Sequence, residues 1–380
     1  MPRLEFESLE KLDHYLAAGG SLENTVCQSL DLRGRTQALV AANLRGAVFL
    51  GCQLEPVAMA HALNQGGMLF PRLPELPYDP YRGFLYSVEE LLEPEELEQR
   101  FLAGDEFAYD KTLDGRIYTH WHETGQERPP DILDALGRRL HDHAITDAME
   151  ELLEGREVVA IMGGHSLGRD HPDYFKVALL SRRLTQEGFF MISGGGPGAM
   201  EATHLGAVFV DRGEDELASA VAALESAPTY REKREWLLTG VAVRRRYPPK
   251  DPERAQSLGI PTWLYGHEPP NLFASHVAKY FANSVREDGL VTVAAAGIVF
   301  APGNAGTVQE IFQDNTQNYY IESGPSPMIL FGEDYWKWRR PVYPLLCSLA
   351  NGKKYENWLS ITDSVGVVVD TLLRYRSARV

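Results

Sequence analysis

Residues 189–207 read FFMISGGGPGAMEATHLGA, an apolar run that ends in a glycine-rich turn and continues into a helical pattern. The run Phe189–Ser193 is typical of a buried strand, and the turn residues after it mark the end of that strand. An earlier stretch has the same order, with a strand at Val158–Met162, a turn at residues 163–166 and a helix from about Asp173 to Glu187. Strand, glycine turn and helix in alternation predict an α/β fold with a doubly wound parallel sheet.

Further elements of this sheet follow from the same patterns. Apolar residues at helical spacing predict an entry helix over Ile132–Leu153, and two more helices that end near Ala207 and Asn318. The remaining strands are expected near Trp263–Tyr265, Ala278–Phe281, Gly297–Ala301, Met328–Phe331 and Gly366–Val369. Together they predict a sheet of about six or seven strands in a domain that spans residues 131–380.

The first 130 residues lack this alternation, and we expect an accessory N-terminal region of irregular α/β character. Its first part carries apolar residues at a period of five, namely Leu39, Leu44, Phe49 and Leu54. This spacing resembles the pentapeptide-repeat pattern, in which such positions point into a narrow β-helix. The few pentads present amount to at most one coil, which we expect to pack against another element. Val88–Leu102 is typical of a short acidic helix.

Composition and charge limit the classes of function. The chain has 380 residues, of which 44% are hydrophobic and 24% charged, as in ordinary globular proteins. Its 37 basic and 53 acidic residues give a net charge of −16, which disfavours nucleic acid polymers and anionic membranes as partners. The widely spaced Cys27, Cys52 and Cys347 fit neither a zinc site nor a disulfide framework. Without an export signal or a long apolar segment, these features predict a cytoplasmic protein.

Two glycine-rich turns carry the chemistry that the sequence predicts. Residues 193–201, SGGGPGAME, and residues 302–310, PGNAGTVQE, each end a strand and begin a helix. A helix N-terminus offers unpaired backbone N–H groups and the positive end of the helix dipole, so each turn is a candidate anion site. Neither turn contains the Gly-Lys-Ser/Thr of a P-loop or the spacing of the Gly-x-Gly-x-x-Gly fingerprint. A standard NTPase or NAD enzyme is therefore disfavoured.

The same two turns carry a family resemblance. In order and separation they resemble the GGGxxGxM and PGGxGTxxE motifs of the Lonely Guy (LOG) family of nucleotide hydrolases, formerly called lysine decarboxylases. Residues 268–271, EPPN, add a likeness to the bacterial purine and pyrimidine nucleotide 5′-monophosphate nucleosidases. The resemblance covers residues 131 to about 373. It implies a Rossmann-like, LOG-type fold, a homo-oligomer (dimer or tetramer), and activity without a metal or other cofactor.

The resemblance further implies hydrolysis of the N-glycosidic bond of a nucleoside 5′-monophosphate, which releases the free base and ribose 5-phosphate. Residues of the three strand-end turns would then bind the nucleotide and its phosphate. These residues are Gly164, Ser166, Gly194, Gly195, Gly196, Gly198, Met200, Gly303, Asn304, Gly306 and Thr307. The phosphate cradle would consist of Gly303, Gly306 and Thr307, whose amides and hydroxyl match the phosphate loop of the family.

Two charged residues are the expected catalytic pair of such an N-glycosidase. Glu310 matches the final Glu of the second motif, and its carboxylate would stabilise an oxocarbenium-like transition state. It follows Thr307 by one helical turn and faces the same side of the helix. Arg286 lies on the expected helix before the second motif, one position away from the Arg of the family, where Glu287 stands instead. Asn304 replaces a Gly of the family, and Asn tolerates left-handed backbone better than other non-glycine residues.

Other interpretations of these residues stay open. Glu310 could have a structural role only, as a carboxylate in the first helical turn that the helix dipole favours. Arg286 could be part of an ordinary surface ion pair. The same pocket is compatible with a nucleotide-binding sensor without turnover, or with a different glycosidic or phosphoribosyl reaction. The histidine pairs His120/His122 and His141/His143 lack a third ligand of suitable spacing, so no metal site is expected.

Overall fold

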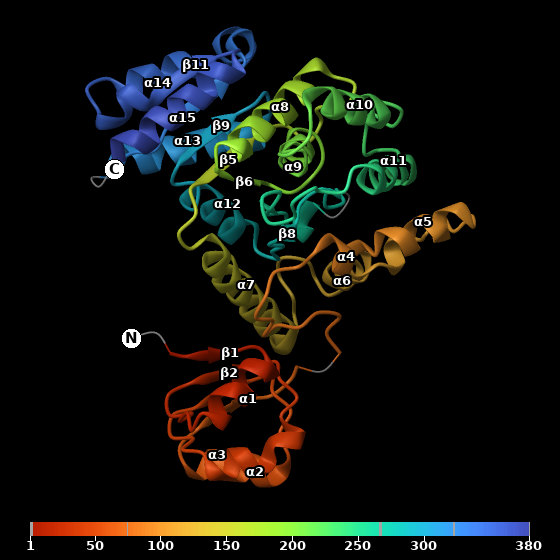
Figure 1. Ribbon diagram of the computed structural model, residues 1–380, viewed down its shortest axis with the longest axis vertical. Helices are drawn as coiled ribbons and strands as arrows, with labels where there is room; N and C mark the ends of the chain where they lie inside the picture. The colour runs from red at the N-terminus through yellow and green to blue at the C-terminus, as the bar shows by residue number, and fades with distance from the viewer. Residues whose placement is uncertain (1–2, 74, 266–267, 322–323, 380) are drawn as a thin grey trace. The chain divides into compact units, whose positions relative to one another are not determined.

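The computed structural model describes residues 3–73, 75–265, 268–321 and 324–379 (Figure 1). The chain divides into two compact units, one formed by Met1–Leu85 and His120–Met149 and the other by Tyr86–Thr119 and Glu150–Val380. The predicted domain boundary near residue 130 stays a prediction. The α/β class is confirmed, because helices alternate with parallel strands in both units.

The first unit contains a parallel sheet in the order β1-β2-β3-β4. Its strands are β1 (Glu5–Phe6), β2 (Val26–Gln28), β3 (Val48–Leu50) and β4 (Met68–Phe70), and its helices include α1 (Leu9–Ala17), α2 (Thr36–Ala41) and α3 (Pro56–Asn64). The strands begin 20–22 residues apart, so each strand and the helix after it form one layer of a short stack. Phe6, Cys27 and Phe49 share one register across neighbouring strands and are buried in one core.

The five-residue period belongs to this stack and does not form a coil of pentapeptide β-helix. Leu39 lies in α2, Leu44 in the loop after it and Phe49 in β3, and all three side chains are buried. Each of them enters the same core, which explains why apolar residues recur at short intervals. The repeating unit is the much longer strand–helix layer.

Two helices replace the single acidic helix expected over Val88–Leu102. α4 (Val88–Leu92) ends at Glu93, whose φ of 45° is left-handed, and α5 (Pro94–Leu102) begins with the proline after it. Proline has no N–H to continue the hydrogen bonds of α4, so the helix is interrupted there. α6 (Leu113–Glu123) and α7 (Ile132–Leu153) follow, the latter with the predicted bounds. In the described ranges no helix combines the length and the apolar content needed to span a membrane.

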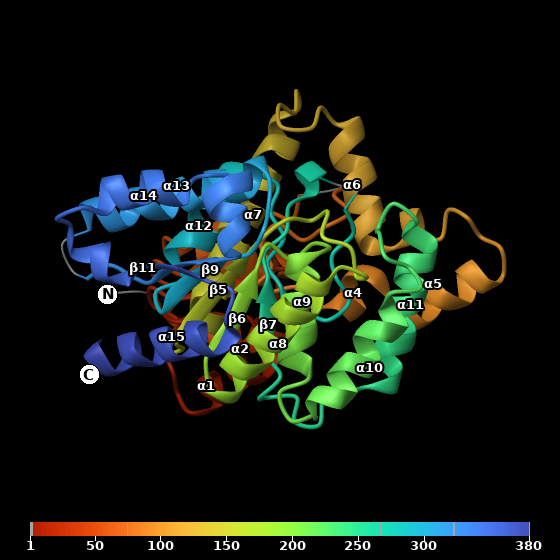
Figure 2. The same ribbon diagram turned by 90° about the horizontal axis from the view of Figure 1, so that it is seen from above.

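The second unit contains a larger sheet, in which the described strands follow the order β11-β10-β9-β5-β6-β7-β8 and every neighbouring pair is parallel. The strands are β5 (Val158–Met162), β6 (Phe190–Ser193), β7 (Ser257–Gly259), β8 (His276–Val277), β9 (Gly297–Phe300), β10 (Met328–Phe331) and β11 (Leu359–Thr362). The helices among them are α8 (Pro172–Gln186), α9 (Ala199–Val208), α10 (Glu214–Leu224), α11 (Lys233–Arg246), α12 (Asn283–Thr292), α13 (Ala305–Tyr320), α14 (Tyr343–Ala350) and α15 (Val365–Arg379). Figure 2 shows α12, α13 and α14 on one side of the central strands and α8 and α15 on the other.

Helices on both sides explain why the central strands are almost entirely apolar. Every residue of β5, β6, β9 and β10 is buried. These four strands lie where the sequence predicts them, within one residue at each end. The glycine turns that follow β5, β6 and β9 are therefore placed as expected.

Three expected strands are wrong. Trp263–Tyr265 forms a short 3₁₀ helix, Ala278–Phe281 follows the short strand β8, and Gly366–Val369 lies inside α15. In α15, Val368 and Leu372 are buried one helical turn apart in the core of this unit. Packing on the core outweighs the strand propensity of the valine run. The last strand is β11, which precedes α15.

The strand order reverses at β5, the first strand of this sheet along the chain. β6, β7 and β8 continue from it in one direction, and β9, β10 and β11 lie on its other side. The chain segments after β5 and β9 leave these neighbouring strands toward opposite faces, which opens a crevice at the carboxyl ends of the strands. The candidate site lies there.

Candidate functional site

A pocket of about 420 Å³ lies at the carboxyl ends of β5, β6 and β9. The turns after these strands surround it, at residues 163–166, 194–198 and 302–306. The sequence-predicted residues that line it are Gly164, Ser166, Gly194, Gly196, Met200, Arg286, Asn304, Gly306, Thr307 and Glu310. The structure thus gathers most of the predicted residues around one cavity, and their roles in ligand binding stay predictions.

The other three predicted glycines, Gly195, Gly198 and Gly303, shape the turns around the pocket. Gly198 precedes α9 with a φ of 71° and a ψ of −129°, a conformation that glycine alone adopts readily. A Cβ there would lie 2.8 Å from the His165 carbonyl oxygen and closer still to that of Gly164. At Gly303 a Cβ would lie 3.0 Å from the Gly164 amide nitrogen. The turns therefore meet backbone to backbone.

Hydrogen bonds join the same turns. The Gly164 N–H donates to the Pro302 carbonyl oxygen at 3.0 Å, and the Ala199 N–H donates to the Gly164 carbonyl oxygen at 3.2 Å. Gly164 thus connects the turn after β5 to the two others. The three turns are consequently linked to one another through their backbones beside the pocket.

Asn271 fixes the turn after β6 through hydrogen bonds to its backbone. Its side-chain amide and its backbone N–H both donate to the Gly195 carbonyl oxygen, at 2.9 and 3.0 Å. Its Oδ1 accepts the N–H groups of Phe273 and Ala274, each at 3.0 Å. Asn271 is fully buried with these groups satisfied. It is the last residue of the segment 268–271, whose sequence carries no local sign of this clamp.

We expect Asn271→Asp to lower the free energy of unfolding by about 2 kcal/mol. The substitution replaces the donor that faces the Gly195 carbonyl oxygen with a second acceptor, so a buried hydrogen bond becomes a repulsion. Urea unfolding followed by tryptophan fluorescence measures the change. Asn351→Asp is the matched control because Asn351 is exposed. Equal losses of stability in the two variants would contradict the clamp.

The N-terminus of α13 faces the pocket. Asn304 is its N-cap, and the first turn of the helix contains no acidic side chain. The amides of Ala305, Gly306 and Thr307 lie in this first turn, where helical hydrogen bonds leave N–H groups unpaired. All three residues line the pocket. The φ of Asn304 is −101°, so the turn forms with ordinary backbone at this position and does not use the tolerance of Asn for left-handed angles.

Arg286 is buried beside the pocket, at 7% exposure, which excludes the surface ion pair as its interpretation. Its Nε donates to the Ile260 carbonyl oxygen at 2.7 Å. Its Nη1 lies 2.8 Å from Glu287 Oε1 and 3.9 Å from Glu310 Oε1. The turn after β6 passes so close that a Cβ at Gly194 would collide with the guanidinium. The structure therefore brings Arg286 and Glu310 close together. Their positions in the sequence, 24 residues apart, do not by themselves require this contact.

Glu287 lines the pocket, although sequence reasoning did not include it among the site residues. It follows Arg286 on α12, is buried, and lines the same cavity. Its Oε2 has no hydrogen-bond partner among the residues that the structure describes. Buried polar oxygens are normally paired, so this oxygen marks a position where a donor from a bound molecule fits. In the sequence, nothing distinguishes Glu287 from a solvent-exposed helical Glu.

Burial raises the pKa of Glu310 to about 8. The Arg286 guanidinium acts against this shift, and the Glu287 carboxylate adds to it. Removal from water disfavours the charged form of a carboxyl group more than a single cation at 3.9 Å restores it. At neutral pH the Glu310 carboxyl group is therefore mostly protonated.

This shift couples stability to pH. The pKa of Glu310 in the folded chain exceeds its ordinary value of 4.5, so between these two values the folded chain binds more protons than the unfolded chain. The stability that Glu310 contributes is complete below its ordinary pKa. It falls by about 1 kcal/mol per pH unit as the pH rises toward the folded-state pKa.

Urea unfolding at a series of pH values between about 5 and 8 measures this slope. Glu310→Gln, which is neutral at every pH, is expected to flatten the part of the slope that Glu310 contributes. The same slope in both chains would contradict the protonation of Glu310 in the folded state.

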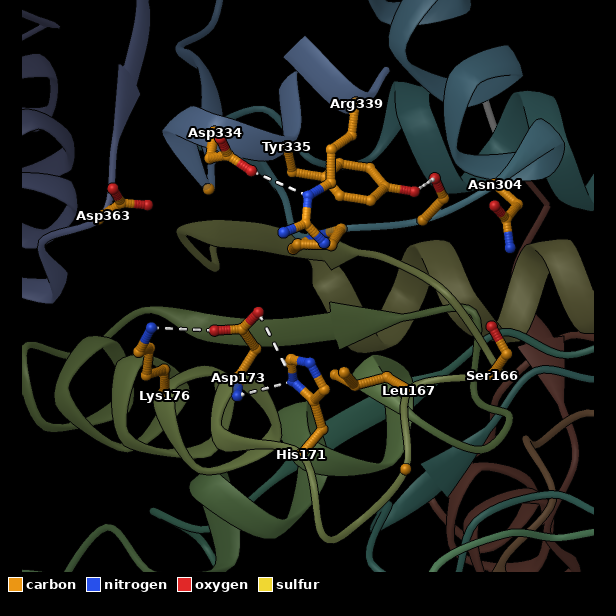
Figure 3. A pocket seen from close by; sticks show the side chains of 14 residues that line it. Ser166, Leu167, His171, Asp173, Lys176, Asn304, Asp334, Tyr335, Arg339 and Asp363 are labelled. Atoms are coloured by element: carbon orange, nitrogen blue, oxygen red, sulfur yellow. Dashed lines mark hydrogen bonds and ion pairs between the residues drawn. The ribbon is translucent and has the colours of Figure 1, made fainter. Parts of the chain in front are cut away.

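A second pocket, of about 580 Å³, adjoins the first and shares Ser166 and Asn304 with it. Figure 3 shows polar side chains on two facing walls, with His171, Asp173 and Lys176 on one and Asp334 and Arg339 on the other. Lys176 lies 3.0 Å from Asp173, and the largely exposed Arg339 lies 2.9 Å from Asp334. Because these cations are open to water whereas Arg286 is buried, the first pocket is the stronger candidate for a specific anion site.

The histidine pairs lie in helices and contact neighbouring acids. His120 Nε2 lies 3.0 Å from Asp134 Oδ1, and the buried His141 lies 3.3 Å from Asp142. Within the described ranges, no group of three or more His, Cys, Asp or Glu side chains is arranged to hold a metal ion.

Among known proteins, the matches to this chain are solved structures. No family model matches the sequence, and no curated protein matches it. One similar solved structure is the molybdenum cofactor binding protein from the phototrophic bacterium Rippkaea orientalis. It is 16% identical over 58% of this chain and 98% of its own, with a TM-score of 0.37. Another is the molybdenum cofactor carrier protein MCP from Chlamydomonas reinhardtii, 11% identical over 58% of this chain and 99% of its own, with a TM-score of 0.36.

These findings correct the assignment to the LOG family. No family model matches, and the two similar structures bear the names of cofactor-binding and carrier proteins, not of LOG hydrolases. The implied hydrolysis of a nucleoside 5′-monophosphate is wrong on the same finding. The alternative of a protein that binds its ligand without turnover agrees in part with these names, which do not point to a nucleotide as the ligand. The physical reason is that both motifs describe glycine turns at helix N-termini, a geometry that serves many anion sites in parallel α/β sheets.

Proposed function

We propose that this chain binds a small organic molecule that carries a phosphate group, in the pocket at the carboxyl ends of β5, β6 and β9. The observation that carries the proposal is the meeting of three glycine turns, the N-terminus of α13 and one buried guanidinium around a single cavity. Glycine lets backbone N–H groups approach a phosphate, and the helix dipole favours its charge. A chain with a net charge of −16 needs such a local positive site to hold an anion.

The start of α13 is the best-suited place for the phosphate. Gly306 leaves its backbone uncovered, since nothing lies within 4 Å of the position that its Cβ would occupy. The neighbouring Thr307 adds a hydroxyl group and lines the same cavity. Hydrogen bonds from N–H groups to an ionised oxygen are about twice as strong as those between neutral groups. A phosphate therefore gains more at this position than a neutral group does.

The rest of the pocket fits an organic body with hydrogen-bond donors. Its volume of about 420 Å³ exceeds that of a phosphate and lies in the range of small-molecule sites. Met200 and Pro261 contribute apolar surface to its lining. The free Oε2 of Glu287 requires a donor, and a protonated Glu310 both donates and accepts. Hydroxyl or amino groups on the ligand satisfy both residues.

Turnover of the bound molecule stays a prediction. The expectation of an enzyme depends on Glu310 and Arg286 acting together, and the two lie 3.9 Å apart. A neutral Glu310 suits hydrogen bonding to a ligand better than stabilisation of a developing positive charge. We therefore propose binding as the function, on a doubly wound sheet of Rossmann-like type that the reversal of strand order at β5 supports.

A thermal-shift panel of matched pairs tests the proposal. Ribose 5-phosphate is compared with ribose, pyridoxal 5′-phosphate with pyridoxal, and glycerol 3-phosphate with glycerol, with inorganic phosphate alone as the reference. The molybdenum cofactor, for which both similar structures are named, is one further probe. A ligand at 100 times its Kd stabilises the folded chain by about 2.7 kcal/mol, so binding is visible as a higher Tm.

The expected result is stabilisation by at least one phosphorylated probe and not by its dephosphorylated partner. Stabilisation by both members of every pair, or by none of the probes, would count against a phosphate site. Chromatography of the recovered ligand shows whether it stays intact, which separates binding from turnover.

A further inference from the structure

A cavity of about 570 Å³ lies at the other end of the larger sheet, at the amino ends of its strands. The segments that lead into β9, β10 and β11 line it, together with the last turns of α12, α13 and α15. Its described lining shares no residue with the pocket of the candidate site. We name it the amino-end cavity. Its lining includes Asp314, Asn318, Trp358, Tyr375, Ala378 and Arg379.

Asp314 on α13 brings a half-satisfied carboxyl group to the amino-end cavity, although its side chain is only 2% exposed. Its Oδ1 accepts from the Asn318 side-chain amide at 3.1 Å, and Asn318 is fixed in turn because the Ser326 N–H donates to its Oδ1 at 2.8 Å. The Oδ2 of Asp314 has no hydrogen-bond partner among the residues that the structure describes. Burial raises the pKa of this carboxyl group well above its ordinary value. Buried carboxyl oxygens are normally paired, so a donor is missing at this position.

The electrostatics of the amino-end cavity favour a positively charged donor. The helices α12, α13 and α15 all end at it, and the C-terminus of a helix is the negative end of its dipole. The last turns of α12 and α13 contain no basic residue, so their terminal carbonyl groups lack the cation that the dipole favours. Trp358 and Tyr375 add aromatic rings to the lining, and such rings attract cations to their faces.

We propose that the amino-end cavity is a second binding site, which takes a small organic amine in its ammonium form. The ammonium group donates to Asp314 Oδ2, and the organic part lies against Trp358 and Tyr375. The volume exceeds that of a bare ion and lies in the range of small-molecule sites. A net charge of −16 attracts cations to this chain. Arg379, the one Lys or Arg in the described lining, opposes this weakly, because its side chain is 45% exposed and lies 3.7 Å from the Glu157 carboxylate.

Thermal shift of the full chain with matched probes at neutral pH and constant ionic strength tests the second site. 2-Phenylethylamine is compared with 2-phenylethanol and n-butylamine with 1-butanol, with potassium chloride as the reference for an inorganic cation. At least one amine is expected to raise the Tm, and neither alcohol, because only the ammonium group supplies the charged donor. Isothermal titration calorimetry then gives the Kd of the amine that stabilises the chain most.

Asp314→Asn is expected to raise this Kd by about 30-fold or more, because a carboxyl oxygen is replaced by a donor that faces the ammonium group. Asparagine has the same shape and keeps the oxygen that accepts from Asn318, so the variant is expected to fold, which circular dichroism checks. Asp370→Asn is the matched control, because Asp370 lies on α15, is exposed and does not line the cavity. Its Kd should stay within about twofold of wild type.

Ala378→Trp tests the cavity without altering Asp314. Ala378 is exposed on α15 and lines the cavity, so the larger side chain is expected to fill part of it and to abolish amine binding in a folded chain. Both variants should keep the wild-type response to phosphorylated probes, which separates this site from the pocket at the carboxyl ends of the strands. The proposal is overturned if neither amine raises the Tm, or if the alcohols or potassium chloride raise it as much. Wild-type amine affinity in Ala378→Trp or in folded Asp314→Asn would overturn it as well.

Discussion

Arg286→Gln is expected to weaken the binding of a phosphorylated ligand by about 100- to 1,000-fold. Among the described residues that line the pocket, Arg286 is the one Lys or Arg side chain. Its loss removes the attraction for the anion and leaves the Glu287 carboxylate beside the ligand without a neighbouring cation. Because the group is buried, water screens these interactions weakly. Isothermal titration calorimetry with the phosphorylated probe that stabilises the wild-type chain most measures the loss.

Two further variants separate charge from geometry. Arg286→Lys keeps the charge but cannot contact Ile260 and Glu287 at once, so an intermediate affinity is expected. Arg183→Gln is the control, because Arg183 is exposed and its Nη2 lies 3.6 Å from Glu214 in a surface ion pair. Its affinity should stay within about twofold of wild type. If Arg286→Gln stays folded and binds the probe as tightly as the wild-type chain, the guanidinium does not hold the anion.

Gly198→Ala is expected to lower the free energy of unfolding by about 3 kcal/mol and to abolish ligand binding. Alanine does not adopt the backbone angles of Gly198 without strain, and its Cβ would overlap the carbonyl oxygens of His165 and Gly164. These are backbone atoms, so the clash is relieved only by moving the turn after β5. That turn is connected to Pro302 through Gly164, and the whole pocket wall would shift. Urea unfolding and calorimetry measure the two effects.

Gly306→Ala is the matched comparison. Nothing lies within 4 Å of its added methyl group, and helical backbone accepts alanine well, so stability should be unchanged or higher by up to about 1 kcal/mol. Binding should still weaken, because the methyl group occupies the space through which a phosphate approaches the backbone. If Gly306→Ala is stable but binds weakly, Gly306 contacts the ligand. If Gly198→Ala is unstable, Gly198 maintains the structure of the turns around the pocket. Wild-type stability in Gly198→Ala would contradict the close packing of the turns.

The central strands could be predicted from the sequence because they are buried on both faces. β5, β6, β9 and β10 read as almost entirely apolar runs bounded by glycine or proline, which is a strong local signal. The edges of the sheet lack that signal. β8 has two residues, β11 is only partly buried, and the valine run of α15 is helical because it packs on the core.

The glycine turns of the site could also be predicted, since the carboxyl ends of neighbouring parallel strands meet at one edge of a sheet. Glu287 and Asn271 could not, because their roles depend on contacts with residues distant in the sequence. Asn271 contacts Gly195, and Glu287 enters the pocket only because α12 passes the turn after β6. The family assignment failed for a related reason: two motifs define the shape of turns, and the chemistry depends on groups such as Glu310 whose protonation the fold decides.

A crystal structure of the full chain with the phosphorylated probe that raises its Tm most tests the central claim directly. The expected result places the phosphate at the start of α13, within hydrogen-bonding distance of the Gly306 and Thr307 amides, with the organic body facing Glu287. A phosphate bound in the second pocket between Asp173 and Asp334, or on the protein surface, would contradict the claim that the glycine turns and α13 form the anion site.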